Sequence, residues 1–378
     1  MSIDTEKAAS MTEIILSAGL ELGLEIWRIE KFELVPVPRH SYGEFFVGDS
    51  YIILHTYEAV NKVTNETEKR QDIHWWIGDE SSQDEYGAAA IIAVMMDDAN
   101  DGLPVQHREA MCFESDLFMS YFNEPLNESL KTKSLTYKLG GVESGFNHVE
   151  INADTDCRLI RVKGRGNKVY GTEVPFSWDS VTCDDVFIFE IGAKLYRWKG
   201  PKANMFEWNQ SNSICKSIIN DEQAGRGEME NLQGDDRFPP EIRDKMPGEC
   251  PDEFPESGIS DKDTKAIKQE AKQEPTLYKI SNASGDMETT KVKQGTELEM
   301  SLLDSNDCFV LDCGQPNKGG EIFIWKGENS NVDERKQCMK SAIKFVAEKG
   351  YGKSCNITVY MQGRETEFFQ QHFDWIEM

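Results

Sequence analysis

Three pairs of acidic residues recur in the chain, each in the same setting. An aspartate stands directly before a β-rich run, and a glutamate lies seven residues after the glycine of a Trp-x-Gly motif. The pairs are Asp49 and Glu85, Asp185 and Glu207, and Asp307 and Glu334. Two fixed carboxylates and a backbone carbonyl beside the aspartate would give the oxygen-rich shell that Ca²⁺ prefers, whereas Mg²⁺ keeps more of its waters. No D-x-D-x-D-G loop is found, so the pattern is not that of an EF-hand.

A second interpretation of these pairs needs no metal. An aspartate often ends a turn before a strand, and each glutamate has the spacing of a helix capping box from Ser82, Asn204 or Asn331. The cap and the helix dipole would hold such a glutamate rigidly. For a single copy the structural interpretation is favoured. The repetition in three copies favours a metal site.

The pairs belong to an internal repeat. The tryptophans of the three Trp-x-Gly motifs, Trp76, Trp198 and Trp325, lie 122 and 127 residues apart. Each copy has the pattern of two strands, a long helix and a further strand, which predicts an α+β domain of about 110–125 residues with the helix packed on a mixed sheet.

The expected organisation follows from this repeat. We expect an N-terminal extension over residues 1–23 and domains over 24–146, 147–262 and 263–378. Within the extension, residues 13–24 are compatible with a short helix or a mobile arm. Residues 221–275 are rich in Asp, Glu, Pro and Gly, which indicates an acidic tail of the second domain followed by a linker.

Composition narrows the class of function. The 378 residues include 67 Asp and Glu against 41 Lys and Arg, a net charge of −26. Nucleic-acid binding is therefore disfavoured, because neutralising phosphates needs a basic surface. We see no signal peptide, no apolar run long enough to span a membrane and no catalytic motif, so we expect no enzyme. Nine cysteines without a CxxC motif fit reduced thiols in a cytoplasmic protein.

Four longer segments resemble one family. They are residues 29–38 (IEKFELVPVP), 82–91 (SQDEYGAAAI), 105–109 (VQHRE) and 140–146 (GGVESGF). In order and spacing they are similar to the gelsolin/villin superfamily, and the chain has the length of its three-domain members. The resemblance implies an α+β fold of three tandem gelsolin-like domains, each with a mixed central β-sheet between a long helix and a shorter helix.

The resemblance also implies a function. It is Ca²⁺-dependent severing of actin filaments and capping of their barbed ends by a cytoskeletal monomer, inhibited by phosphatidylinositol 4,5-bisphosphate. The expected partners are monomeric and filamentous actin. Capping without severing is the closest alternative, and a calcium-buffering or scaffold module that barely touches actin is a second one.

Calcium ligands are implied by the same resemblance. The first site would use the Gly48 carbonyl, Asp49, Glu85 and the Val142 carbonyl, and the second the Asp184 carbonyl, Asp185, Glu207 and Asp261. The third would use the Asn306 carbonyl, Asp307 and Glu334. An ion shared between the first domain and actin would be held by Asp97 and the carbonyls of Gly102 and Pro104. The family usually has glycine at the position of Asp184, where only a carbonyl is required.

Contact residues for actin and lipid follow in the same way. The long helix of the first domain would place one face in the actin cleft, through Phe32, Ile91, Ile92, Met95 and Asp98. Without the resemblance, such an apolar stripe is typical of a core. Filament-side binding is implied for Arg158, Arg161, Lys163 and Arg165, and phosphoinositide binding for these four with Lys131, Lys133, Lys138 and Lys168. By composition alone, this basic segment is equally compatible with a solvated strand edge.

Overall fold

The computed structural model describes residues 10–60, 65–122, 130, 132–143, 147–149, 157–166, 168–234, 237–258, 274–281, 288–296, 298–314, 321–330, 332–351 and 355–374. Within these ranges no side chain is described at 83–86, 142–143, 147–149, 221, 281, 288, 332–337 and 340. The chain forms two compact units. Unit 1 contains Met1–Pro36, Ser50–Glu114 and Lys268–Met378, and unit 2 contains Val37–Asp49 and Ser115–Ile267.

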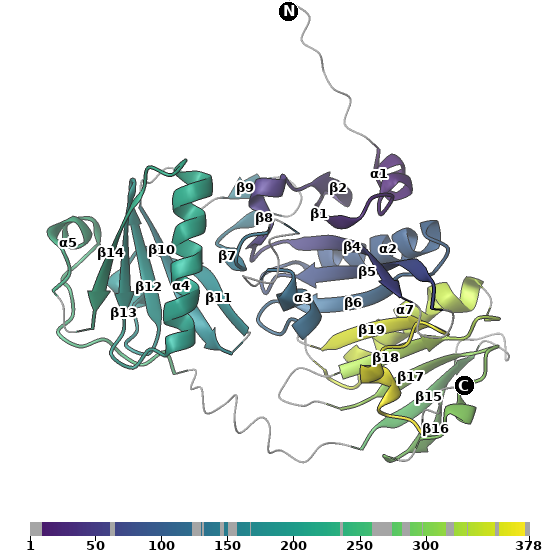
Figure 1. The fold of residues 1–378 in the computed structure, drawn as a ribbon. Helices are drawn as coiled ribbons and strands as arrows, with labels where there is room; N and C mark the ends of the chain where they lie inside the picture. The colour runs from purple at the N-terminus through teal and green to yellow at the C-terminus, as the bar shows by residue number, and fades with distance from the viewer. Residues whose placement is uncertain are drawn as a thin grey trace, which may run out of the picture. The chain divides into compact units, whose positions relative to one another are not determined.

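Unit 1 is built on one ten-stranded sheet to which the first and third repeats each contribute five strands (Figure 1). The first repeat supplies β1 (Gly23–Glu30), β2 (Glu33–Pro36), β4 (Ser50–Val60), β5 (Thr67–Ile77) and β6 (Val105–Ala110). The third supplies β15 (Thr276–Ser281), β16 (Glu288–Gln294), β17 (Cys308–Asp312), β18 (Glu321–Lys326) and β19 (Asn356–Met361). The strand order is β16-β15-β17-β18-β19-β6-β5-β4-β1-β2.

The two halves of this sheet meet at a seam between β6 and β19. These strands pair antiparallel, with His107 opposite Thr358. Inside each half, the strand after the long helix lies parallel to the strand before it, β6 beside β5 and β19 beside β18. The other pairs in each half are antiparallel, so the sheet is mixed. One sheet therefore joins two repeats that are far apart in sequence.

The long helices of unit 1 share one hydrophobic core. α2 (Gln83–Ala99) and α7 (Val332–Glu348) contact each other, and their buried residues join those of β4, β5, β17 and β18 in a single cluster. A second core on the third repeat includes Phe309, Phe323 and Trp325 and is closed by Phe369 of α8 (Glu367–Gln370). The sheet therefore buries apolar side chains on both faces.

The N-terminal extension contributes a helix, α1 (Met11–Ser17). Ser10 and Glu13 form a complete capping box at its start, and Ile14 and Ile15 are buried in the core that α2 also joins. Of the two expectations for this region, the short helix is confirmed over Met11–Ser17. Within the described part of the chain, no helix is long and apolar enough to cross a membrane.

Unit 2 has a seven-stranded sheet in the order β14-β13-β12-β10-β11-β7-β3. Its strands are β3 (Glu44–Phe46), β7 (Thr136–Lys138), β10 (Cys157–Arg165), β11 (Lys168–Val174), β12 (Val186–Ile191), β13 (Lys194–Lys199) and β14 (Glu228–Gln233). A separate hairpin joins β8 (Gly141–Glu143) and β9 (Asn147–Val149). The helices are α3 (Asp116–Ser120), α4 (Met205–Ser217) and α5 (Pro240–Lys245). Short helical turns are η1 (Arg39–Ser41), η2 (Trp178–Ser180) and η3 (Ile218–Glu222) in this unit, and η4 (Met300–Leu302) in unit 1.

Two separate cores flank the sheet of unit 2. α4 packs with Ile160, Val186 and Ile188 in one cluster, and α5 joins an aromatic cluster around Trp198 and Phe238 in the other. A sheet between a long and a shorter helix is the α+β arrangement expected from the sequence, and unit 2 shows it (Figure 1).

The acidic stretch that the sequence predicts as a tail of the second domain followed by a linker contains folded elements. Much of 221–258 is folded, because β14 pairs parallel with β13 and α5 buries Ile242. Phe238, Met246 and Phe254 pack in the same aromatic core. A few large apolar residues in an acidic stretch are enough to fold it, which average composition hides.

The compact units also cut across the predicted domain boundaries. Val37–Asp49 and the stretch from Ser115 belong to unit 2, although both were assigned to the first domain. The reason is that β3 and β7 pair with each other, and β7 continues the sheet through β11. The boundaries at 24–146, 147–262 and 263–378 remain a prediction about the repeats.

Candidate functional site

The second repeat brings its predicted acidic pair to one place. Asp185 lies at the start of β12 and Glu207 in the first turn of α4, and both are almost fully buried. Glu207 Oε2 accepts from the Asn204 backbone N–H at 3.1 Å, completing a capping box, and Oε1 accepts from the Gly164 N–H at 3.2 Å. Lys163, the neighbour of Gly164, donates from Nζ to Asp185 Oδ1 at 3.0 Å. The two carboxylates therefore contact adjacent residues of β10, Asp185 through Lys163 and Glu207 through Gly164.

Lysine supplies the positive charge at this point. Lys163 Nζ also donates to Ser257 Oγ at 2.6 Å, while Asp185 Oδ2 accepts from Thr182 Oγ1 at 2.8 Å. The oxygen donors fit a hard cation such as Ca²⁺, since buried carboxylates need a counter-charge. Lys163 already provides that charge, so it is the group that has to move before a cation could use Asp185 Oδ1.

Asp184 takes a different role from the one implied for it. Its carboxylate accepts from the Ser257 backbone N–H at 2.8 Å and from Ser257 Oγ at 2.6 Å. Burial alone would raise the pKa of Asp184, but the hydrogen bonds from Ser257, helped by Lys163, lower it below its ordinary value. The resemblance implies a role for the backbone carbonyl of Asp184 only. In the structure its side chain forms the hydrogen bonds, both with Ser257. The predicted ligand Asp261 lies outside the described residues.

The first and third sites are described in part. Asp49 is fully buried, and the Gly48 N–H donates to the Gly140 carbonyl at 2.9 Å. A Cβ added to Gly141 would stand 2.8 Å from Asp49 Oδ1, so the chain at this position passes too close to the carboxylate for a side chain. In the third repeat, Asp307 pairs with Lys279 at 2.6 Å. The side chains of Glu85, Val142 and Glu334 are outside the described part, as is their place relative to these aspartates.

Asp97 does not lie on an open surface. Its Oδ2 accepts from Gln106 Nε2 at 2.7 Å and from Lys326 Nζ at 3.0 Å, and both members of the Asp97–Lys326 ion pair are almost fully buried. The Gly102 N–H donates to the Asp97 backbone carbonyl at 2.8 Å, and Pro104 is buried. In this arrangement an ion shared with a second protein cannot reach Asp97, because the third repeat covers it through Lys326 of β18.

The outer face of α2 contains most of the predicted contact residues. Ile91 is 56% exposed and Met95 is 39% exposed, and Asp98 and Phe32 are exposed as well. The prediction for Ile92 was wrong, because its side chain is only 3% exposed and belongs to the core under the helix. One position along a helix turns a side chain by about 100°, which is enough to move Ile92 from the outer face to the core.

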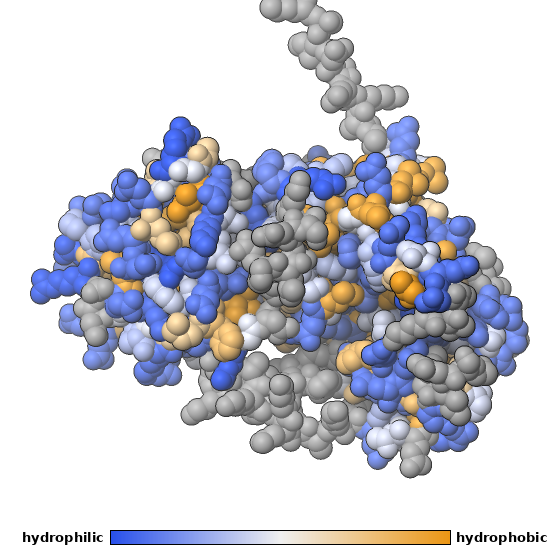
Figure 2. All heavy atoms as spheres, viewed as in Figure 1, coloured by the Kyte–Doolittle hydropathy of each residue, from blue (hydrophilic) through white to orange (hydrophobic). Residues whose placement is uncertain are grey.

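An apolar hollow of about 440 Å³ opens beside this face. It is lined from α2 by Gly87, Ala90, Ile91, Val94, Met95 and Asp98, and from α7 by Met339 and Ile343. Sequence reasoning missed the two α7 residues, since only the pairing of the first and third repeats brings them to α2. Elsewhere in unit 1, Leu16 of α1 and Leu20 and Leu22 beyond it are exposed, and hydrophobic residues gather near α1 and β2 in Figure 2.

Several of the predicted basic residues are paired with acids. Arg158 contacts Glu190 and Glu222, each at 2.7 Å, and these carboxylates raise its pKa although burial opposes the shift. Lys133 Nζ lies 2.6 Å from Glu44, and Lys138 lies 3.7 Å from the same residue.

These pairs enclose one narrow pocket of unit 2. Lys133, Lys138, Arg158, Glu44 and Glu222 all line it. The structure therefore joins the two predicted lipid-binding segments in one pocket, together with acidic residues that no sequence motif marks. Arg161, Arg165 and Lys168 lie further along β10 and β11, where Lys168 is 3.6 Å from Asp116. Lys131 lies outside the described residues.

Comparisons with known proteins agree with this architecture. The Gelsolin repeat family matches residues 31–119 and 290–370. Gelsolin from Gallus gallus is 40% identical over 357 residues, which cover 94% of this chain and 43% of that protein. The macrophage-capping protein of Homo sapiens is 37% identical over 355 residues, which cover 93% of this chain and 94% of that protein.

One solved structure matches over 58% of this chain and 99% of its own, at 19% identity. Its title is "Crystal Structure of the Thorarchaeota 2DGel3/rabbit actin complex", and the TM-score of 0.23 is too low to support a conclusion about fold or partner. The chain spans less than half of chicken gelsolin but nearly all of the macrophage-capping protein. On the identity to both relatives and the matched repeats, this chain belongs to the gelsolin/villin superfamily.

Proposed function

We propose that this protein is a calcium-regulated component of the cytoskeleton that binds actin, caps the barbed ends of filaments and severs them, without catalysing a reaction. The observation that carries the proposal is the exposed apolar face of α2, with Ile91 and Met95 beside the hollow. Membership of the gelsolin/villin superfamily supports actin as the partner, and the match along nearly the whole macrophage-capping protein supports capping.

The outer face of α2 has the features of a helix that docks into a groove. Ile91 and Met95 are one turn apart and present apolar area, and the exposed Asp98 adds a charge at the same edge. Such apolar residues on a soluble protein cost free energy unless a partner covers them. We infer that these three residues enter a hydrophobic cleft of actin.

Regulation would act through lysines that pair with the predicted ligands. Asp97, Asp185 and Asp307 pair with Lys326, Lys163 and Lys279. Bound Ca²⁺ would supply the positive charge that these lysines now provide; Asp185 with Glu207, and Asp307 with the Asn306 carbonyl, are the described residues that would hold it. Release of Asp97 from Lys326, with parting of β6 from β19, would uncover the first repeat for actin. Actin binding to the first repeat would therefore compete with the pairing of β6 and β19.

The basic residues of unit 2 would serve the filament side and the lipid. Lys133, Lys138 and Arg158 line one pocket and are charge-neutralised by glutamates. The phosphates of phosphatidylinositol 4,5-bisphosphate would replace these glutamates as partners, because charge-assisted bonds to phosphate are strong. Exposed Arg165 and half-buried Arg161, four positions earlier on β10, would contact the acidic filament surface.

Imaging single actin filaments tests this function. In Ca²⁺, the wild type should fragment filaments and block growth at their barbed ends, and Ile91→Asp and Met95→Asp should lose both effects at least 10-fold, the equivalent of about 1.4 kcal/mol of binding. Val292→Asp is a matched control, since Val292 is an exposed apolar residue of β16 away from α2. Equal activity of all four proteins would refute the assignment of α2.

Capping without severing is the second candidate function, and the similarity to a macrophage-capping protein favours it. The same images separate the two. Long filaments that persist in Ca²⁺ with blocked barbed ends would establish capping alone. Filaments that shorten from within would establish severing. Adding vesicles with phosphatidylinositol 4,5-bisphosphate should restore filament length and growth, and Arg158→Gln should weaken that inhibition.

A further inference from the structure

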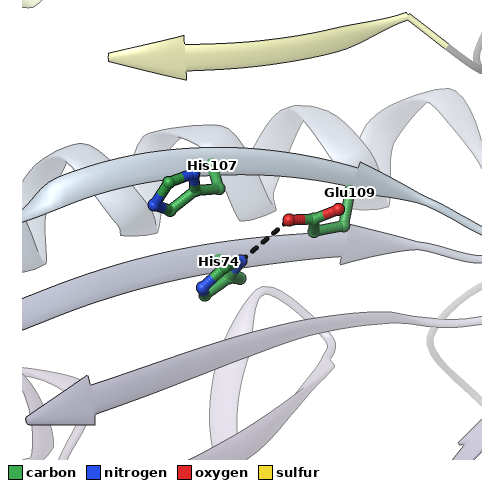
Figure 3. Close-up of side chains that lie close together, drawn as sticks. All are labelled: His74, His107 and Glu109. Atoms are coloured by element: carbon green, nitrogen blue, oxygen red, sulfur yellow. Dashed lines mark hydrogen bonds and ion pairs between the residues drawn. The ribbon is translucent and has the colours of Figure 1, made fainter. Parts of the chain in front are cut away.

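A cluster of buried side chains in unit 1 has no part in the proposed actin-binding function. His74 on β5 and His107 on β6 are neighbours in the parallel register, and Glu109 lies two residues further along β6 on the same side of the sheet. All three are less than 9% exposed. Figure 3 shows the two rings and the carboxylate turned toward one space between these strands.

The geometry of the cluster is compact. His74 Nδ1 and Glu109 Oε1 are 2.9 Å apart, and the two imidazole rings stack with centroids 4.4 Å apart and planes 16° apart. One ligand atom from each of the three residues lies within 4.8 Å of the other two. Among the described residues, these three form the one group of histidine, cysteine or acidic side chains whose possible ligand atoms all lie this close together.

A fourth residue orients one of the imidazoles. Asp72 on β5 lies 2.9 Å from His107 Nε2, which leaves Nδ1 of His107 as the nitrogen that can offer a lone pair. A carboxylate on the far nitrogen of a histidine is the usual support of a metal-binding imidazole, because it fixes the tautomer and makes the ring a better donor.

We propose that His74, His107 and Glu109 form a buried site for a transition-metal dication, with Zn²⁺ as the leading occupant. Two imidazole nitrogens and one carboxylate oxygen suit Zn²⁺, whereas Ca²⁺ takes oxygen ligands. Water would complete the shell, as in other zinc sites with three protein ligands. A dication would also compensate the two carboxyl groups, Asp72 and Glu109, that the cluster buries.

Metal binding requires a small rearrangement. Zinc bonds of about 2.0–2.1 Å require ligand atoms at 4.8 Å to approach by roughly 1–1.5 Å. Since the rings are now nearly parallel, one imidazole has to turn about its Cβ–Cγ bond so that both nitrogens face the ion. If His74 ligates through Nδ1, the proton on that atom moves to Nε2 and the ring stays neutral. None of these residues is a predicted calcium ligand or belongs to α2, so zinc binding can be tested independently of actin binding.

The site would link two strands next to the seam. His107 stands opposite Thr358 of β19, so β6 carries a metal ligand on the strand that joins the first and third repeats. A metal that bridges β5 and β6 would hold β6 on the first repeat. The physical effect we expect is a higher free energy of unfolding for unit 1 in Zn²⁺, without dependence on Ca²⁺.

Titration of the full chain with metal tests the proposal. The chain is freed of metal with a chelator, saturated with Ca²⁺ so that the oxygen sites are filled, and titrated with Zn²⁺ by calorimetry. We expect one equivalent to bind to the wild type. Co²⁺ as a spectroscopic probe should give the d–d bands of a tetrahedral ion without a thiolate charge-transfer band. Absence of zinc binding, or a thiolate band, would overturn the assignment without the need for any variant.

Variants then locate the bound ion. Glu109→Gln and His107→Asn should weaken zinc binding at least 100-fold, and Asp72→Asn should weaken it by about 10–100-fold because it acts through His107. His40→Asn, an exposed histidine, and Cys313→Ser, whose sulfur lies 3.8 Å from His372, are matched controls that should bind zinc as the wild type does. Circular dichroism checks that each variant is folded. Loss of binding in Cys313→Ser with retention in Glu109→Gln would refute the site.

Discussion

Asp97 in unit 1 and Asp185 in unit 2 pair with lysine in the same way but over very different ranges of the chain. Asp97 meets Lys326, which is 229 positions away and in another repeat, whereas Asp185 meets Lys163, 22 positions away on the neighbouring strand β10. All four side chains are largely buried. The two ion pairs thus have the same chemistry. Their positions in the topology differ, so the Asp97 pair connects two repeats and the Asp185 pair stabilises one repeat.

The surroundings sharpen this difference. Beside Asp97, the seam of unit 1 also has a hydrogen bond from Arg108 to the Cys355 carbonyl and an ion pair of Arg364 with Glu68 at 2.7 Å. Beside Asp185, Thr182 and Ser257 complete a network inside the second repeat. Breaking the first pair should therefore loosen two repeats, and breaking the second should change one site.

The largest effect is expected from Lys326→Met. Removing the ammonium takes the positive charge away from the buried carboxylate of Asp97 while the hydrogen bond from Gln106 stays, and loss of the partner of a buried charge costs about 3–5 kcal/mol. Urea unfolding followed by hydrogen exchange in unit 1 measures the loss. Lys344→Met is the control on α7, since Lys344 is 77% exposed. If both variants were equally stable, Asp97–Lys326 would not be a link between the repeats.

A smaller effect on stability is expected from Lys163→Met. Asp185 keeps its bond from Thr182, so the loss should be about 1–3 kcal/mol and confined to unit 2. In exchange, the variant should bind Ca²⁺ more tightly, on the order of 10-fold, because no ammonium has to leave Asp185. Calorimetric titration with Ca²⁺ reads this out. Lys202→Met, an exposed lysine paired with Glu256, serves as control. Weaker calcium binding by Lys163→Met would show that the lysine assists the site.

Acid should affect the two units at different pH values. The pKa of folded His74 lies well below 6.5 through burial, so the unfolded chain binds more protons and unit 1 loses stability as pH falls below about 6.5, by at most about 1.4 kcal/mol per pH unit for this group. The pKa of Asp184 is lowered from 3.8 despite burial, through its bonds from Ser257, so its contribution to unit 2 is lost only as pH falls below that value.

Hydrogen exchange at a series of pH values, in the presence of a chelator, checks the order of these losses. Unit 1 should lose protection first. His74→Gln should flatten the pH dependence of unit 1, whatever its effect on stability at neutral pH, and exposed His40→Gln should not. Simultaneous loss in both units, with the same slope in all three proteins, would contradict the assignment to His74.

These same residues show which parts of the fold can be predicted from the sequence. The repeat predicted the strands after Asp49, Asp185 and Asp307 and the helix that begins near Glu207, because local pattern and capping chemistry decide such elements. The repeat also placed Ile91 and Met95 on a helix, but their exposure was implied only by the family resemblance, since the apolar stripe alone is typical of a core.

Contacts between residues that are far apart in the chain could not be predicted from the sequence. Lys326 opposite Asp97 and Met339 beside Met95 depend on the pairing of β6 with β19, which joins residues far apart in the chain. Glu44, Glu190 and Glu222 beside the basic residues could not be singled out among 67 acidic residues. Ile92 was misassigned because the resemblance matched it to the outer face together with Ile91, whereas one position along the helix turns its side chain into the core.

The smallest effect is expected from Lys279→Met in the third repeat. Lys279 and Asp307 make the same kind of ion pair, at 2.6 Å, but Lys279 is 39% exposed, so water screens the interaction. The variant should lose only about 0.2–1 kcal/mol of unfolding free energy, and high salt should remove most of the difference from the wild type. Urea unfolding at low and high salt measures both. A loss as large as that of Lys326→Met would mean that burial does not set the strength of these pairs, and the contrast between the two units would have to rest on topology alone.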